Sequence, residues 1–448
     1  MSKVFSRDYA SWGRYPKAAP KSVLRVNWRH EFVDQQDASA NLLPYGMGRS
    51  YGDSCLNNDG GLLDARPLKR FINFDPDKGV LRCEAGLPLS EILDFIVPRG
   101  WFLPVVPGTK FVTVGGAIAN DIHGKNHHKA GTFGCHVTQL ELSRSDGTRQ
   151  VCSRTENQPL FKATVGGLGL TGLILWAEIQ LIPISGSQIC MESVKFGALD
   201  VFFDLADESD ESFDYTVAWI DSLQRGEGFG RGLFMRGNHA KSSQKKAKNT
   251  ASAGMSVPFD FPSFSLNSLT VRAFNALYYA KQHERKVKKE VHYNPFFFPL
   301  DGVRNWNRIY GSKGFLQYQC VIPRDKAKEG IAEILKAATQ SRQGSFLSVI
   351  KLFGSIESPG LLSFPREGAT LALDFPFKGK ATLDLLNAFD AIVRQADGAV
   401  YPAKDARMSA ADFKQYFPEW RQFMKYKDPN YNSNFWRRVV GNMEAKAK

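Results

Sequence analysis

The pattern of hydrophobic and polar positions changes near residue 184. Before this point the chain shows short β-rich runs separated by Gly, Pro and Asp turns, such as residues 61–64 and 80–85. One helix is predicted near residues 89–97, where Leu89, Ile92, Leu93 and Ile96 have helical spacing. This pattern predicts an α+β domain.

After Pro183 the glycine-rich loops become rare and the elements lengthen. Strands are predicted at residues 215–220, 315–321 and 370–375, and helices at 326–341 and 383–395. A chain of 448 residues is also longer than one hydrophobic core usually supports, which is about 250–300 residues. The fold class that we predict is therefore α+β with two domains, with boundaries at residues 1–186 and 187–398.

The net charge of +13 favours an anionic partner, such as a membrane surface, a phosphorylated substrate or nucleic acid. Residues 237–257 are polar and basic and predict a mobile loop. Residues 281–289 form a second basic stretch whose side chains are expected to share a helical surface. Solvated surface is the alternative for both. Nucleic-acid binding is not predicted, because the chain lacks a helix-turn-helix and basic runs interleaved with aromatics.

The six cysteines are scattered without zinc-site spacing, so buried, unpaired thiols are expected. Residues 1–21 carry charges and aromatics instead of the apolar stretch of a signal peptide, which predicts a cytoplasmic protein. The apolar stretch at 166–184 contains several glycines together with Glu178 and Gln180. A buried loop and strand is therefore predicted there, and not a membrane span.

Three glycine-rich segments carry the candidate chemistry: residues 45–53 (YGMGRSYGD), 107–128 and 163–174. In the first, alternating glycines allow backbone N–H groups to form an anion-binding nest, although an ordinary tight turn explains it equally well. The spacing differs from the Rossmann and Walker motifs. The second crowds glycine, histidine and amide residues that need polar partners. Together the segments indicate an extended ligand with a pyrophosphate and a flat ring, for which FAD is suited.

The histidines of the second segment do not predict a metal site. His127 and His128 are adjacent in the chain, and both lie close to Lys125. The positive charge of this lysine opposes a bound cation.

The order of these motifs resembles the PCMH-type FAD-binding domain of the vanillyl-alcohol-oxidase superfamily. More closely, the chain resembles the decaprenylphosphoryl-β-D-ribose oxidase family. The string DIHGKNHH at residues 121–128 carries this resemblance, with further motifs at 306–308, 315–319, 351–354, 374–376 and 403–405. The resemblance implies an FAD domain, a substrate domain with an antiparallel sheet, and a C-terminal segment, 399–448, that returns to the FAD domain.

Many superfamily members bond the flavin to a histidine of the first segment. Arg49 stands at that position here, so the resemblance implies FAD without a covalent bond. The residues that it assigns to cofactor binding are Gly46, Gly48, Arg49, Ser50, Tyr51, Gly52, Gly108, Thr113, Val114, Gly115, Gly116, Asn120, His123, Leu173 and Tyr401.

On the substrate side the resemblance implies amides and tyrosines for sugar hydroxyls, and lysines for a phosphodiester or for negative charge on the reduced flavin. These residues are Lys125, Trp219, Tyr310, Gln317, Gln319, Lys351 and Lys404.

Lys404 is the first candidate for balancing the flavin charge, and a surface lysine paired with Asp405 is the alternative. The proton acceptor stays open among Tyr51, His123 and Lys404. Ala372 stands where mycobacterial members carry a cysteine, so thiol reactivity is not expected there.

The activity implied is FAD-dependent oxidation of the 2′-hydroxyl of a polyprenylphosphoryl-β-D-ribose, the first half of ribose-to-arabinose epimerisation. An aldonolactone or alditol oxidase of the same superfamily is the alternative. The expected partners are a polyprenyl-phosphate-linked pentose and an NAD(P)H-dependent short-chain reductase. Peripheral contact with the inner face of the plasma membrane is also expected.

Overall fold

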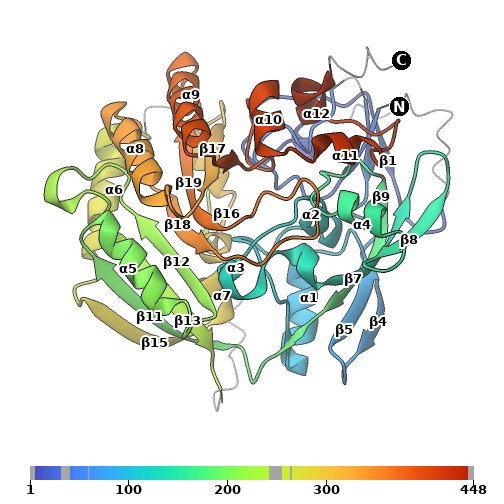
Figure 1. The fold of residues 1–448 in the computed structure, drawn as a ribbon, viewed down its shortest axis with the longest axis horizontal. Coiled ribbons are helices and arrows are strands. Elements are labelled where there is room, and N and C mark those ends of the chain that lie inside the picture. Colours follow the sequence, from blue (N-terminus) through green and yellow to red (C-terminus); the bar gives the residue numbers. More distant parts are fainter. Residues whose placement is uncertain (1–5, 32–40, 59, 242–254, 263–264, 442–448) are drawn as a thin grey trace.

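The structure is a computed structural model that describes residues 6–31, 41–58, 60–241, 255–262 and 265–441. It has two halves, each built around an antiparallel sheet with helices beside it (Figure 1). The predicted α+β fold class is confirmed.

The N-terminal half contains a small parallel sheet of order β1-β3-β2 and an antiparallel sheet of order β4-β5-β9-β7-β8. A short antiparallel pair joins β6 to β10. The strands are β1 (Ser22–Arg25), β2 (Leu42–Tyr45), β3 (Gly61–Asp64), β4 (Phe71–Asp75), β5 (Val80–Glu84), β6 (Trp101–Phe102), β7 (Val137–Ser143), β8 (Arg149–Ser153), β9 (Leu173–Gln180) and β10 (Ile182–Pro183).

The helices of this half are short. The apolar side chains at helical spacing in α1, Leu89, Ile92, Leu93 and Ile96, are all buried, which explains why the pattern predicted this helix. The helices are α1 (Leu89–Ile96), α2 (Val114–Ala119), α3 (His127–Ala130) and α4 (Gln158–Thr164), with 3₁₀ turns at Ser6–Tyr9, Val97–Arg99 and Phe133–His136.

The second half is built on an eight-stranded antiparallel sheet of order β15-β11-β13-β12-β18-β19-β17-β20. A separate short pair joins β14 (Met255–Ser256) to β16 (Val303–Arg304). The sheet strands are β11 (Gln188–Phe196), β12 (Tyr215–Ile220), β13 (Gly232–His239), β15 (Lys286–His292), β17 (Phe315–Ile322), β18 (Ser348–Phe353), β19 (Gly368–Pro376) and β20 (Ala399–Val400).

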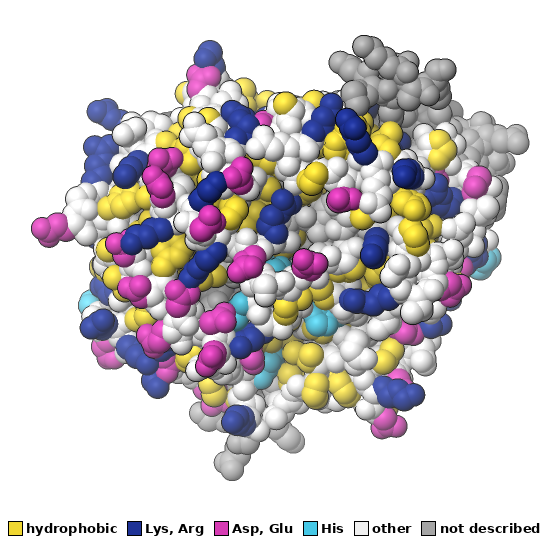
Figure 2. Space-filling view, viewed as in Figure 1, with side chains coloured by type: hydrophobic (Ala, Val, Ile, Leu, Met, Phe, Trp, Pro, Cys, Tyr) yellow, Lys and Arg dark blue, Asp and Glu magenta, His cyan; other side chains and the backbone are white. Residues whose placement is uncertain are grey.

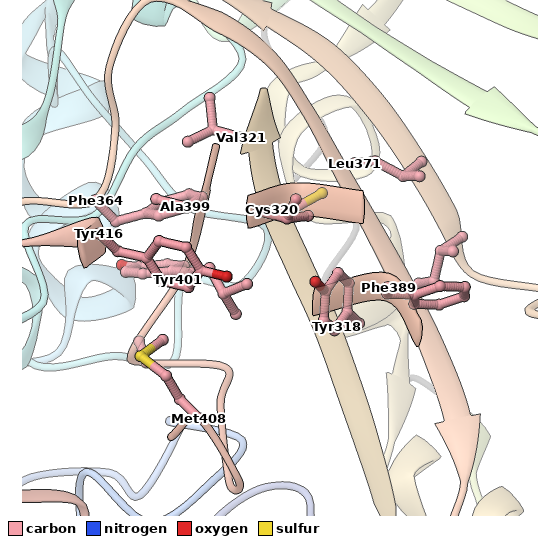
Figure 3. Close-up of a cluster of buried hydrophobic side chains, with 14 of the residues drawn as sticks. Tyr318, Cys320, Val321, Phe364, Leu371, Phe389, Ala399, Tyr401, Met408 and Tyr416 are labelled. Atoms are coloured by element: carbon pink, nitrogen blue, oxygen red, sulfur yellow. The ribbon is translucent and has the colours of Figure 1, made fainter. Parts of the chain in front are cut away.

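Helices α5, α8 and α9 pack against one face of this large sheet (Figure 1). Helix α9 contributes Phe389, whose ring lies 5.2 Å from that of Tyr318 on β17 (Figure 3). The helices of the second half are α5 (Leu199–Ser209), α6 (Ser268–Ala280), α7 (Tyr293–Phe297), α8 (Ala327–Gln340) and α9 (Lys380–Gln395), with 3₁₀ turns at Gly226–Gly228, Pro299–Gly302 and Trp306–Tyr310.

Side chains alternate between the two faces of the large sheet, as the pleat of a strand requires. In β17, Leu316, Tyr318 and Cys320 join the hydrophobic core, while Gln317 and Gln319 line a cavity on the opposite face. In β18 and β19 the buried core side chains include Ile350, Leu371, Leu373 and Phe375. The cavity-facing side chains of these two strands are Val349, Lys351, Thr370 and Ala372.

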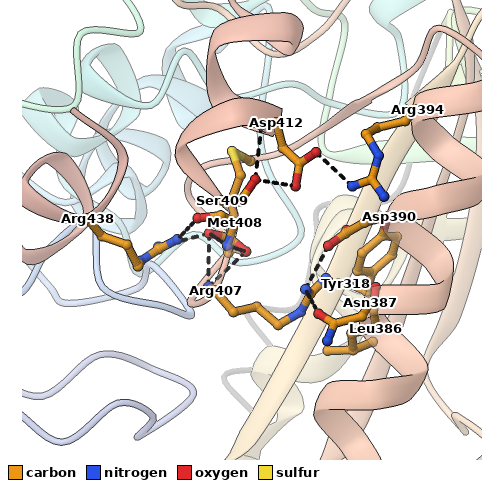
Figure 4. Close-up of polar contacts among 11 residues, drawn as sticks. Tyr318, Leu386, Asn387, Asp390, Arg394, Arg407, Met408, Ser409, Asp412 and Arg438 are labelled. Atoms are coloured by element: carbon orange, nitrogen blue, oxygen red, sulfur yellow. Dashed lines mark hydrogen bonds and ion pairs between the residues drawn. The ribbon is translucent and has the colours of Figure 1, made fainter.

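The C-terminal segment is held to both halves by ion pairs. Arg407 lies 2.7 Å from Asp390 of α9, and Arg394 of the same helix lies 2.7 Å from Asp412 (Figure 4). The segment then forms helices α10 (Ala410–Tyr416), α11 (Trp420–Met424) and α12 (Asn434–Val439).

Arg438 of α12 connects the C-terminal segment to the first glycine-rich segment. Its guanidinium lies 2.7 Å from Asp53 and 2.9 Å from Asp405. The backbone N–H of Tyr51 also donates to the carbonyl of Ala403 at 2.9 Å. These contacts fix Lys404 beside the first glycine-rich segment.

One predicted element is wrong. The basic residues of the 281–289 stretch do not share a helix, because Lys286–His292 form β15 and pair with β11. Lys286 and Lys288 project to the same side of this strand and lie 2.9 and 2.6 Å from Glu192. A helix would lose both the ladder to β11 and these ion pairs.

The predicted mobile loop at 237–257 overlaps regular structure at both ends. Residues 237–239 complete β13 and residues 255–256 form β14, while residues 242–254 lie outside the described residues.

The six cysteines are unpaired, and Cys83, Cys152 and Cys320 are buried. Cys190 is exposed because its position in β11 faces outward, so the prediction of a buried thiol is wrong there. Cys55 and Cys135 are partly exposed.

The apolar stretch at 166–184 forms a glycine-rich turn followed by β9 and β10. Across the described part of the chain, no helix has both the length and the apolar content that crossing a bilayer demands.

The alternation of side chains in β18 predicts different effects of two substitutions on the free energy of unfolding. Ile350 is fully buried, whereas its neighbour Val349 faces the cavity and is 37% exposed. Ile350→Ala should lower the free energy of unfolding by about 2–5 kcal/mol, because it leaves a cavity in the hydrophobic core. Val349→Ala should cost less than about 1 kcal/mol. Urea unfolding followed by circular dichroism compares them, and equal losses would contradict this assignment of faces.

Candidate active site

A cavity of about 930 Å³ lies between the glycine-rich segments and the polar face of the large sheet. This volume is near the upper end of the range for ligand sites, about 300–1,000 Å³. Most of the predicted site residues line it: Gly46, Gly48, Arg49, Ser50, Tyr51, Gly108, Thr113, Gly115, Gly116, Asn120, His123, Lys125, Leu173, Trp219, Gln317, Gln319, Lys351, Tyr401 and Lys404.

Three predicted residues do not line this cavity. Gly52 packs under the C-terminal segment, where an added Cβ would lie 1.6 Å from the carbonyl oxygen of Asp405. Val114 is fully buried at the start of α2. Tyr310 is stacked on Phe315, with ring centroids 4.2 Å apart, and its hydroxyl approaches Asp374 at 3.4 Å.

The first two glycine-rich segments meet directly. A Cβ on Gly46 would lie 2.5 Å from the hydroxyl of Thr113, so only glycine permits this approach. The same hydroxyl caps α2 by accepting from the backbone N–H of Gly116 at 3.1 Å. Gly48 has a φ of +59°, a conformation that glycine adopts without strain. The chain therefore turns sharply here and leaves its backbone at the cavity wall.

The residues that line the cavity suit an extended nucleotide cofactor. All three segments contribute glycines to its wall, so backbone amides can approach a ligand closely. A Cβ on Gly108 would meet nothing within 4 Å, which shows open space beside the second segment. Ser54, which also lines the cavity, has a buried hydroxyl without a hydrogen-bond partner among the described residues. These features fit FAD.

His123 is held between the second segment and the large sheet. Its Nδ1 lies 2.8 Å from Nζ of Lys351, and its Nε2 lies 2.9 Å from the amide nitrogen of Gln319. Lys351 also donates to the carbonyl of Gly124 at 2.7 Å. Burial, and then the charge of Lys351, hold the pKa of His123 well below its usual value. The imidazole is therefore neutral at physiological pH.

The amino group of Lys404 lies 3.8 Å from the ring centroid of Tyr51 and does not pair with Asp405. Gln317 donates to Asp374 at 2.5 Å in the same region. Burial lowers the pKa of Lys404 to about 8, although Asp374 opposes this shift. Burial raises the pKa of the Tyr51 phenol well above its usual value. The lysine is thus mostly charged near pH 7, and the phenol stays protonated.

Three lysines gather in this cavity. Lys125 donates to the carbonyl of Phe297 at 3.2 Å, and burial lowers its pKa to about 8. Burial, followed by the charges of Lys125 and Lys404, lowers the pKa of Lys351 well below its usual value. Crowded, desolvated amines favour an anionic ligand, because it would restore the charged form of each amine.

The structure adds residues that the sequence analysis missed. Trp12 lines the cavity and lies under the guanidinium of Arg49, 4.0 Å from the carbon to the ring centroid. Asp374 organises Gln317. No local motif signals Trp12, and the motif at 374–376 contains Asp374 without assigning it a role, since each residue acts through a partner that is distant in sequence. The indole N–H of Trp219 donates a hydrogen bond to the carbonyl of Phe346 at 3.0 Å. Trp219 therefore presents only its ring to a ligand.

Comparison with known proteins agrees with this geometry. Residues 32–153 match the FAD binding domain family. The decaprenylphosphoryl-β-D-ribose oxidase of Mycolicibacterium smegmatis is 35% identical over 419 residues, which cover 90% of each chain. The chain belongs to the decaprenylphosphoryl-β-D-ribose oxidase family. The matched FAD domain includes the first two glycine-rich segments, and FAD is the cofactor of this chain.

Two other relatives are less similar to this chain. An uncharacterized Streptomyces coelicolor protein, encoded in the 5′ region of mprA, is 30% identical over 372 residues, which cover 79% of this chain and all of that protein. The L-gulonolactone oxidase of Mus musculus is 29% identical over 164 residues, only 37% of this chain and 36% of that enzyme. The similarity to the ribose oxidase therefore extends over far more of the chain, including the large sheet.

The contact between Gly46 and Thr113 makes a prediction about FAD binding. Gly46→Ala should force the two segments apart and lower FAD affinity at least about tenfold, because the cap of α2 and the cavity wall move together. Gly197→Ala is the matched control, since a Cβ there meets nothing within 4 Å. Flavin content per protein, read from absorbance after gel filtration, measures the effect. Full flavin content in Gly46→Ala would contradict the prediction.

Proposed function

We propose that the protein oxidises the 2′-hydroxyl of a polyprenylphosphoryl-β-D-ribose to the 2′-keto sugar, the first half of epimerisation to arabinose. One observation carries this proposal: a single cavity combines the glycine-rich wall suited to FAD with three lysines and with the amides of Gln317 and Gln319. Lysines match a phosphodiester, and amides match sugar hydroxyls. The extensive similarity to the ribose oxidase supports the same substrate.

FAD, when bound, accepts the hydride that leaves the sugar carbon. The residues around the sugar have separate tasks in this proposal. Lys404 supplies positive charge where the reduced cofactor becomes negative. Tyr51, whose pKa is raised by burial, stays protonated and donates a hydrogen bond. The imidazole of His123, whose two nitrogens lie against Lys351 and Gln319, holds these two side chains in place beside the sugar. Arg49 offers no imidazole for a flavin bond, so FAD is held without a covalent link.

The 2′-ketone requires a second enzyme that delivers hydride to it. We assign this step to a separate NAD(P)H-dependent short-chain reductase, since the sequence contains no second dinucleotide fingerprint. Because the proposed substrate is a lipid, we place the enzyme as a peripheral protein at the membrane, on the cytoplasmic face expected from the sequence. The chain would contribute to the supply of arabinose for cell-envelope glycans.

A spectral titration tests the proposed function. The purified protein should show a flavin spectrum, and acid precipitation should release the flavin into the supernatant. Anaerobic addition of a short-chain prenylphosphoryl-ribose should bleach this spectrum, while free ribose, aldonolactones and alditols should not. Bleaching by a lactone or an alditol instead would support the alternative oxidase class, and a colourless folded protein would reject both.

Lys404→Met tests the role of the cavity lysine. The variant should keep its FAD, because the glycine-rich wall is unchanged, but flavin reduction by substrate should slow at least about 100-fold. Lys380→Met, at a lysine whose side chain is 87% exposed, is the matched control. Anaerobic stopped-flow absorbance measures the rate, and unchanged reduction in Lys404→Met would reject the role.

A further inference from the structure

Helix α6 carries an apolar stripe on its outer face. Leu269 and Leu277 are 74% and 73% exposed, and Ala273, Ala276 and Ala280 are exposed as well. Residues three, four and eight positions apart lie on the same side of a helix, so these side chains form one row. Large aliphatic side chains that are this exposed and lie in one row indicate a surface that binds an apolar partner.

The helix is firmly attached by its opposite face. Asn275 is fully buried and donates to Asp221 at 2.9 Å. Tyr278 packs on Trp219, with ring centroids 4.7 Å apart, and the hydroxyl of Tyr279 donates to the carbonyl of Phe196 at 3.1 Å. The outward position of the leucines is therefore fixed by contacts with the large sheet.

The charge on this helix has one sign. Helix α6 contains Arg272 and no Asp or Glu. Just after the helix, the exposed Lys281 and Arg285 outnumber one exposed acid, Glu284. By contrast, the face of the molecule in Figure 2 mixes Lys and Arg with Asp and Glu. An apolar row flanked by basic side chains matches a membrane interface, where acyl chains lie beneath anionic headgroups.

The stripe adjoins the opening of the cavity. Phe274 of α6 is 45% exposed and also lines the cavity. Arg304, the second residue of β16, is also exposed and also lines the cavity. Met255 of β14 is 78% exposed, and Phe259, three residues after β14, is 64% exposed. Exposed apolar side chains therefore occur on α6 and near the β14–β16 pair, and both of these elements contribute residues to the cavity lining.

We propose that the outer face of α6, together with Met255 and Phe259, docks on an anionic phospholipid bilayer so that the cavity opens toward the lipid. This inference rests on the proposed lipid-linked substrate, whose chain would stay in the bilayer while its sugar enters the cavity. A second copy of the chain is a poorer occupant. The 13-residue helix is only about 20 Å long, and a stable interface needs about 800 Å² from each partner.

Vesicle sedimentation with the FAD-loaded, full-length protein tests this proposal. Wild type should sediment with vesicles of phosphatidylcholine and phosphatidylglycerol, and less with pure phosphatidylcholine, because basic residues flank the stripe. The double variant Leu269→Ser/Leu277→Ser should lower the partition coefficient roughly tenfold or more. Ile356→Ser, at an apolar side chain 38% exposed on another surface, is the matched control and should bind like wild type.

The outcomes separate this proposal from the proposed function. Flavin content and bleaching by a short, water-soluble prenylphosphoryl-ribose should be unchanged in the double variant, because neither leucine lines the cavity. Wild type that stays in the supernatant, or a double variant that sediments equally well, overturns the docking surface and leaves the flavin assay untouched. A wild-type dimer in sedimentation velocity that becomes a monomer in the double variant also overturns it, since the stripe would then join two copies.

Discussion

The pleat of the eight-stranded sheet is the constraint on which the rest of the structure depends. Because neighbouring side chains in a strand point to opposite faces, alternating residues of β17, β18 and β19 form the hydrophobic core and the polar cavity wall. A shift in register by one residue would exchange Gln319 and Lys351 with their apolar neighbours. The burial of core residues such as Ile350 and Leu371 therefore also orients the polar groups of the site.

The cavity holds an excess of positive charge that an anionic ligand would neutralise. Lys125, Lys351 and Lys404 sit in one desolvated space, and burial lowers the pKa of each. Desolvated amines bind a phosphodiester more strongly than solvated ones, because less water screens the attraction. The same desolvation keeps His123 neutral beside Lys351. The cavity thus gathers several cations, and the described residues include no group of side chains that could hold a metal ion.

Closure of the site comes from the C-terminal segment. Its Arg438 joins Asp53 to Asp405, and its Arg407 reaches Asp390 on α9. Tyr401 stacks on Phe364 with ring centroids 4.6 Å apart and donates to the carbonyl of Asn120 at 2.7 Å (Figure 3). The last part of the chain therefore holds the FAD-domain segments against the large sheet, which explains why the two halves share one hydrophobic cluster.

Local pattern alone determined the elements whose periodicity is strong, including the strand at 215–220, the helix near 89–97 and the glycine-rich turns. These elements depend on residues that are close in sequence, and the spacing of their apolar side chains indicates directly which face is buried. Tertiary structure alone decided that the basic stretch at 286–292 is a strand, because its pairing with β11 and Glu192 outweighs helical spacing. It also brought Trp12 and Asp374 to the site, since their partners Arg49 and Gln317 are distant along the chain and only packing brings such residues together.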